Sequence, residues 1–304
     1  MLSVRCVATF SSVNRAVDIW IFRLLWLVLP FAAGPLFADA LSGTQRSFEV
    51  GVTILLWVGW GALLVASMVP RTETLTALRV VAPMAVVGAI WAALSAADKS
   101  TTLTIVLALV FTGNAALFAF RPTVTDAFAD GSSYGDEARF LLSTPGALLL
   151  GPIQLVWLAI AAGSVVGPLF LLSQNWVVGA ILTIVGWALV YFAVPVLHRL
   201  SERWLVFVPA GMVVHDKTAL REPQLFRKES IDALGPAPVD TDVEDLSLGA
   251  PGLALRATLS SPSKVIKNTT GKEIDLTEVH GFIVSPKRPG AVVAEAKRRG
   301  FQIG

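Results

Sequence analysis

The stretch Val194–Thr218, VPVLHRLSERWLVFVPAGMVVHDKT, contains the change of pattern that divides this chain in two. Its first residues end a long uninterrupted apolar run of the kind found in membrane helices. From Arg203 onward the apolar runs are short and alternating, and the turn at Pro209–Gly211 separates RWLVFV from MVVHD, which is typical of a β-hairpin. We therefore expect a helical domain over residues 1–200 and a β-rich domain over residues 201–304.

The part before this point has the composition of a membrane domain. The whole chain is 54% hydrophobic and 15% charged, against about 45–50% and about 25% in soluble domains. A helix needs about 17–25 apolar residues to cross a hydrocarbon core of about 30 Å. Six such segments recur, and we expect spans at residues 19–38, 50–69, 80–97, 101–120, within 141–172, and at 176–197.

The fifth segment is longer than a single span requires. It also contains Pro145, Pro152 and Pro168, and proline tends to kink or end a helix because it lacks a backbone donor. We expect a short broken lead-in over residues 141–152, followed by the true span.

Arginine and lysine residues in the flanks of these segments predict the orientation, because such residues accumulate on the cytoplasmic side. With the N-terminus inside, the outer flanks contain only Arg46 and Lys99. The cytoplasmic flanks contain nine such residues: Arg5, Arg15, Arg23, Arg71, Arg79, Arg121, Arg139, Arg199 and Arg203. We therefore expect a multi-pass protein of the inner or plasma membrane with both termini in the cytoplasm.

The start of the chain allows a second interpretation. Arg5, Arg15 and Arg23 precede an apolar run that ends in Ala38–Ala40. This pattern also fits a signal peptide with an A-x-A cleavage site. Cleavage would leave the orientation of the remaining spans unchanged.

The polar residues inside the spans are neutral. No Asp, Glu, Lys or Arg lies near the middle of a predicted span, which argues against a proton- or sodium-coupled transporter. Asn114 and Gln154 are candidate intramembrane polar contacts, and we favour hydrogen bonds between helices over contact with a substrate. Gly163 and Gly167 have the small-xxx-small spacing of a helix-packing face.

The connection Arg121–Arg139 is the longest predicted cytoplasmic loop. Its four acidic and two basic residues leave it with a net charge of minus two. We interpret it as a solvated loop. The alternative is an acidic surface that docks onto the more basic tail.

The tail contains about seven runs typical of strands. RWLVFV and MVVHD form one hairpin, PQLFRKESI is a third strand, and DLSL and LALRATL form a second hairpin around Pro251 and Gly252. KVIKNTTGKEIDL holds a turn at Asn268–Gly271, and GFIVS is the last strand. A helix follows, with Gly300 as a left-handed cap and Phe301 folding back behind it. We expect a small antiparallel β barrel or sandwich closed by this helix.

The tail resembles a known family over about residues 203–304. The residues that carry the resemblance are RWLVFVPAGMVVHD, LREPQLFRKESIDALGPAP and GFIVSPKRPGAVVAEAKRRG. They are similar to the bacterial pleckstrin-homology-like (PH-like) domains found at the cytoplasmic ends of multi-span membrane proteins, especially in actinobacteria. The resemblance implies a binding and assembly module, and it carries over no catalytic or ligand-binding motif.

Basic residues of the tail are candidate contacts for anionic lipid or for a protein partner. Each contributes about 1 kcal/mol beside an anionic leaflet. Acidic residues nearly balance them, however, and the segment Val239–Asp245 is itself acidic. The candidates are Arg227, Lys228, Lys297, Arg298 and Arg299.

The sequence contains no recognisable catalytic, metal-binding or cofactor-binding motif. His198, His215 and His280 all lie at or beyond the end of the last span, and the net charge of +2 does not indicate nucleic acid. We therefore predict a non-enzymatic scaffold or assembly protein of the cell envelope, whose partners are membrane lipids and either another protein or further copies of itself. The alternatives are a small-molecule transporter or permease subunit with a regulatory cytoplasmic domain and, on location alone, a lipid-modifying enzyme.

Overall fold

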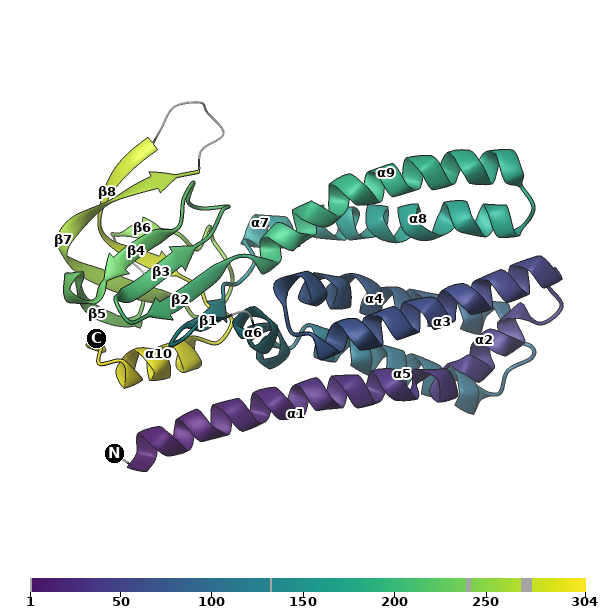
Figure 1. Cartoon of the computed structure of the whole chain (residues 1–304), viewed down its shortest axis with the longest axis horizontal. Helices are drawn as coiled ribbons and strands as arrows, with labels where there is room; N and C mark the ends of the chain where they lie inside the picture. The colour runs from purple at the N-terminus through teal and green to yellow at the C-terminus, as the bar shows by residue number, and fades with distance from the viewer. Residues whose placement is uncertain (1, 132, 239–241, 269–274) are drawn as a thin grey trace. The chain divides into compact units, whose positions relative to one another are not determined.

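The computed structural model describes residues 2–131, 133–238, 242–268 and 275–304 (Figure 1). Its contacts divide the chain into two compact units. The membrane unit comprises Ala16–Thr125 and Gln154–His198, and the β unit comprises Met1–Arg15, Asp126–Ile153 and Arg199–Gly304. The β unit therefore includes residues 126–153, which the sequence analysis assigned to the membrane domain.

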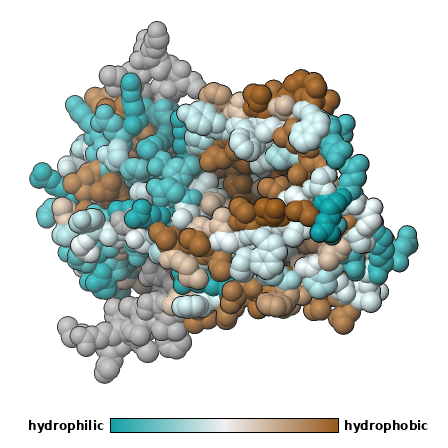
Figure 2. All heavy atoms as spheres, turned by 45° about the vertical axis from the view of Figure 1, so that its right-hand side comes forward, coloured by the Kyte–Doolittle hydropathy of each residue, from teal (hydrophilic) through white to brown (hydrophobic). Residues whose placement is uncertain are grey.

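Six helical segments are long and apolar enough to cross a membrane, which confirms the six predicted spans. The first is formed by the end of α1 (Leu2–Ala32) with α2 (Gly34–Leu41). The others are α3 (Arg46–Met68), α4 (Thr72–Ser95), α5 (Thr102–Ala119), α8 (Pro152–Leu172) and α9 (Trp176–Ser201). In Figure 2 hydrophobic side chains gather over the spanning helices, and hydrophilic ones gather over the β unit.

Polar groups within the first spans are satisfied by partners on the same helices or neighbouring ones. The indole Nε1 of Trp26 donates to the carbonyl of Trp60 at 2.9 Å, and Trp60 Nε1 donates back to the Trp26 carbonyl at 2.8 Å. Arg23 donates to the carbonyl of Ser67 at 2.7 Å, in the last turn of α3. Such pairing is required in hydrocarbon, where an unsatisfied polar group costs several kcal/mol.

The expected broken lead-in to the fifth span is confirmed. β1 (Ala138–Leu141) and the short helix α7 (Gly146–Leu149) precede α8, which begins at Pro152. Pro168 lies inside α8. The connection Arg121–Arg139 is more ordered than a loop, because it contains α6 (Pro122–Asp130) and the first residues of β1.

The β unit contains two four-stranded sheets, and neither closes on itself. The first has the order β1-β2-β3-β4, with β2 (Trp204–Val208), β3 (Gly211–His215) and β4 (Gln224–Arg227). The second has the order β5-β7-β8-β6, with β5 (Ile231–Pro236), β6 (Glu244–Asp245), β7 (Leu255–Lys267) and β8 (Asp275–Val284). A short 3-10 turn, η1 (Lys228–Ser230), separates β4 from β5.

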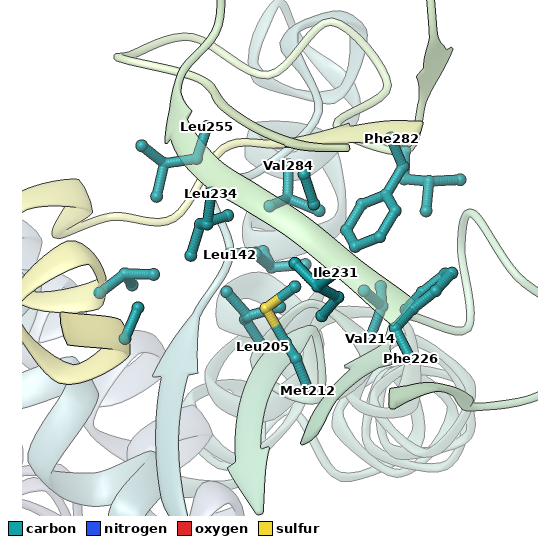
Figure 3. Packing of buried hydrophobic residues seen from close by; sticks show 14 of the residues in the cluster. Leu142, Leu205, Met212, Val214, Phe226, Ile231, Leu234, Leu255, Phe282 and Val284 are labelled. Carbon is teal, nitrogen blue, oxygen red and sulfur yellow. The ribbon is translucent and has the colours of Figure 1, made fainter. Parts of the chain in front are cut away.

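Alternating side chains of both sheets form one hydrophobic core (Figure 3). The rings of Phe226 and Phe282, one from each sheet, stack with centroids 4.2 Å apart. The helix α10 (Pro289–Arg298) contributes Val292 and Ala296 to this core. The cap predicted at Gly300 is confirmed: its φ is +75°, and the Phe301 amide donates to the carbonyl of Ala296 at 3.0 Å.

Three strand assignments from the sequence are wrong. PQLFRKESI is not one strand, because η1 divides it between β4 and the start of β5 in different sheets. DLSL does not pair with LALRATL; instead β6 runs parallel to β8, and β7 pairs with β5 and β8. Asp275 and Leu276, which end the run KEIDL, and residues 281–284 of the run GFIVS belong to the single strand β8. Most of the predicted turn at Asn268–Gly271, and residues 239–241 of the acidic segment, lie outside the described residues.

One strand of the first sheet, β1, lies outside the tail in sequence. It pairs antiparallel with β2, with Phe140 opposite Leu205 and Leu141 opposite Trp204. It comes from the connection between the fourth and fifth spans. Isolated bridges also join Leu142 to Pro286 and Leu234 to Ile303. The sheets of the β unit are therefore built from two separate stretches of the chain, both continuous with membrane helices.

Candidate functional site

The acidic connection docks onto the basic tail within the β unit, as the alternative interpretation of this segment proposed. The buried carboxylate of Asp126 accepts from the amide of Leu141 at 3.3 Å and lies 3.5 Å from Nη1 of Arg288. Further along, Arg299 Nη2 donates to the carbonyl of Asp136 at 2.8 Å and to its carboxylate at 3.3 Å. These contacts hold the segment that supplies β1 against the segment that supplies α10.

A single contact brings the five basic candidate residues of the tail into one region. Lys228 Nζ donates to the carbonyl of Arg299 at 2.6 Å and lies 5.8 Å from the ring centroid of Phe301. The amine thus binds just beyond the end of α10, where the helix dipole favours a positive charge. We call this region the basic corner; it comprises Arg227, Lys228, Lys297, Arg298 and Arg299.

Part of the charge of the basic corner is neutralised. Glu295 accepts from Arg298 Nε at 2.8 Å and from Arg299 Nε at 2.6 Å. Burial by itself would raise the pKa of Glu295, but the hydrogen bonds from both arginines outweigh it and leave the pKa below its ordinary value. The hydrogen bond between Arg298 and Glu295 raises the pKa of Arg298, although burial acts in the opposite direction. Two arginines therefore hold the C-terminal helix together while they face solvent only in part.

Arg227 and Lys297 are exposed cations of the corner that Glu295 does not neutralise. Both side chains are exposed, and neither forms an ion pair with another residue of the described ranges. A partner that carries acidic groups could approach these two residues without first breaking an internal pair.

The junction between α9 and β2 contains a buried ion pair that the sequence analysis missed. Arg203 Nη2 lies 2.6 Å from Asp216 Oδ2, with side chains 1% and 0% exposed. Arg203 Nη1 also donates to the carbonyl of Ser143 at 2.6 Å, and Asp216 Oδ1 accepts from the amide of Thr218 at 2.9 Å. In the sequence, Arg203 and Asp216 stand at the two ends of the predicted hairpin. The positive-inside pattern alone gives Arg203 only the role of a flanking charge.

The two candidate polar residues of the spans lie in different helices, Asn114 in α5 and Gln154 in α8. Asn114 Nδ2 donates to the carbonyl of Val110 in its own helix at 2.7 Å. Gln154 is exposed near the start of α8.

Gly163 and Gly167 lie where α8 meets α9. A Cβ on Gly163 would lie 2.6 Å from the carbonyl oxygen of Gly186, and one on Gly167 would lie 2.3 Å from the amide nitrogen of Thr183. Real Cβ atoms do not approach so closely, so glycine lets the two backbones touch. In the part of α9 that belongs to the membrane unit, the buried positions are Gly179, Gly186 and Ala193, seven residues apart. We call this contact the glycine seam.

The membrane unit also has a groove of about 410 Å³ at one end of α4 and α9. Its walls are mainly apolar, and its polar groups are Glu73, Thr76 and His198. Thr76 Oγ1 donates to the carbonyl of Thr72 at 3.1 Å and lies 3.0 Å from His198 Nδ1. The tautomer of the His198 ring decides which of these two atoms donates to the other.

Within the described ranges, no group of three or more His, Cys, Asp or Glu side chains is arranged to hold a metal ion. A second cavity, of about 290 Å³, lies beside β6 and β8 and is lined by acidic side chains and His280. Two of its carboxylates pair with lysines: Glu244 lies 2.8 Å from Lys267, and Glu278 lies 3.6 Å from Lys264.

No protein-family model, curated protein or solved structure matches this chain in sequence or fold comparisons.

Proposed function

We propose that this chain is a non-enzymatic membrane scaffold whose β unit is a cytoplasmic PH-like module. In this proposal the basic corner binds an acidic surface of a protein partner in the cell envelope. The two four-stranded sheets followed by one C-terminal helix support the PH-like assignment. The positive-inside pattern of the flanks supports the cytoplasmic location.

The observation that carries the proposal is the contact between Lys228 and the carbonyl of Arg299. It places the β4 end and the α10 end together, although about 70 residues separate them in sequence. Arg227 and Lys297 stay exposed on either side of this contact. A charged rim of this kind steers association with an oppositely charged partner.

The way the β unit is attached supports a scaffold. Four covalent connections join it to the membrane unit: within α1, within α6, near the start of α8 and near the end of α9. The Arg203 side chain binds both Ser143 before α8 and Asp216 after α9, so two of these connections are tied to each other. A module held in this way stays at the membrane surface and restricts where a partner can bind.

The test is photocrosslinking of the full chain in its native membrane. A photoreactive residue at position 297 should crosslink to one recurrent protein, and the Arg227→Glu/Lys297→Glu pair should reduce a second, independent crosslink from position 228. Lys264 is the matched control, because it is an exposed lysine on β7 in the same unit. Equal crosslinking from positions 264 and 297, or crosslinks to lipid alone, would contradict the proposal.

A further inference from the structure

Two uncharged segments of the β unit meet beside the first residue of a spanning helix. The first is PGALLLGPI, residues 145–153, which contains α7 and leads into α8 at Pro152. The second is LSLGAPGL, residues 246–253, which follows β6. The two segments are in contact, because a Cβ on Gly146 would lie 2.7 Å from the carbonyl oxygen of Gly249.

Both segments present leucines to the outside. Leu149 and Leu150 are exposed, and Leu150 has 90% of its surface open. In the second segment Leu248 is 41% exposed and Leu253 is 56% exposed. We call these four residues the leucine edge. Soluble surfaces rarely expose such a group of leucines, so a contiguous set indicates an interaction surface.

The second segment is held in a defined shape. Asp245 accepts from the amide of Ser247 at 2.8 Å and from the amide of Gly249 at 3.3 Å, and the Leu246 amide donates to Ile283 at 3.0 Å. Leu248 has a φ of +57°, a conformation that costs a leucine about 1 kcal/mol or more. The turn therefore keeps a strained leucine pointing outward instead of allowing it to fold back.

Chain continuity identifies the occupant of this surface. Leu150 lies two residues before Pro152, the first residue of a helix long and apolar enough to cross the membrane. Two residues span at most about 7 Å, so Leu150 lies within about that distance of the start of this candidate span. The contact between Gly146 and Gly249 places the second segment beside the start of the same span. The absence of charge in both segments matches the region between lipid headgroups and acyl chains.

We propose that the leucine edge inserts into the interface of the leaflet that α8 enters, so that the β unit binds the lipid bilayer directly through Leu248 and Leu253. This surface is separate from the basic corner and requires no protein partner. It does not rest on the proposed scaffold function, and it does not require anionic lipid, since apolar burial is the driving force.

The test uses the full chain in phosphatidylcholine vesicles, with a polarity-sensitive fluorophore on a single cysteine. Cys6→Ser supplies a background without native cysteine. Labels are placed at Leu248→Cys and Leu253→Cys. The matched controls are Leu225→Cys and Leu276→Cys, which are 41% and 53% exposed in the same unit and lie outside both segments.

The expected result is a blue-shifted emission at positions 248 and 253, with several-fold stronger quenching by lipid-attached nitroxide than at positions 225 and 276. Aqueous iodide should quench in the opposite order. Equal quenching at all four positions would overturn the proposal. A blue shift at 248 and 253 without quenching by the lipid nitroxide would overturn it too, because it would indicate a protein contact. If the strained position 248 does not tolerate the label, the comparison of position 253 with positions 225 and 276 is the test.

Discussion

Arg203 and Asp216 form a buried ion pair, 2.6 Å apart, that joins the end of the last spanning helix to the end of the first hairpin of the tail. The second guanidinium nitrogen binds Ser143, just before the fifth span. The arginine thus joins Ser143 to Asp216, two residues that are far apart in sequence.

We predict that Asp216→Asn destabilises the β unit by about 3–5 kcal/mol, because it leaves the Arg203 charge buried and uncompensated. The double substitution Arg203→Met/Asp216→Leu should be milder, because it removes both charges. Thermal unfolding of the purified full chain in detergent, followed by near-ultraviolet circular dichroism, measures this difference.

The control for this prediction is Glu202→Gln, which removes the partner of Lys217 in an exposed pair with a separation of 3.0 Å. Exposed pairs contribute about 0–1 kcal/mol. If Asp216→Asn unfolds no earlier than Glu202→Gln, the ion pair does not stabilise the junction.

Gly163→Ala should weaken the glycine seam between α8 and α9. The new Cβ would meet the Gly186 carbonyl oxygen at 2.6 Å, and overpacking of this kind costs about 1–3 kcal/mol. Gly59→Ala is the matched control, because a Cβ there meets nothing within 4 Å. We expect a lower midpoint of thermal unfolding for Gly163→Ala only, and equal midpoints for the two variants would refute the seam.

Acid should weaken the C-terminal helix through Glu295. Its pKa in the folded protein lies below the ordinary value of about 4.3. Glu295 therefore contributes stability that is fully present above this ordinary value and is lost as the pH falls through the lower, folded value. Because the pair is partly solvated, the contribution is about 1 kcal/mol or less.

The measurement is the difference in unfolding midpoint between the wild type and Glu295→Gln, first at neutral pH and then below the ordinary pKa. The difference should be largest at neutral pH and should shrink on acidification, because the wild type alone loses the charge. A difference that is the same at both pH values would show that the arginine pairs do not depend on the Glu295 charge.

Asn114→Leu should leave the stability of the membrane unit within about 1 kcal/mol of the wild type, since Asn114 bonds only to its own helix at Val110 in the described contacts. Trp60→Phe is the contrast, because it removes the donor to the Trp26 carbonyl in a neighbouring helix. A transporter that uses Asn114 would lose flux on this substitution, and a scaffold would not. Loss of a measured substrate flux would therefore support the transporter alternative over our proposal.

Local pattern was sufficient for several features. The six spans follow from the length and apolarity of single segments, and those properties need no long-range contact to be recognised. The break before α8 follows from Pro145 and Pro152, and the left-handed cap at Gly300 follows from the local geometry of a helix end. The spacing of Gly163 and Gly167 also identified the face of α8 that meets α9, although not which helix would meet it.

The sequence by itself therefore determined which segments cross the membrane and that a β-rich part follows them. Only the tertiary structure decided which strands pair. β1 pairs with β2 although two spanning helices lie between them in sequence, and β6 runs parallel to β8. The tertiary structure also decided that Asp126, Asp136, Arg203 and Lys228 find partners in distant segments. The physical reason is that helical spans satisfy their backbone hydrogen bonds within one segment, whereas strand pairing and buried charges depend on partners that neighbouring residues do not specify.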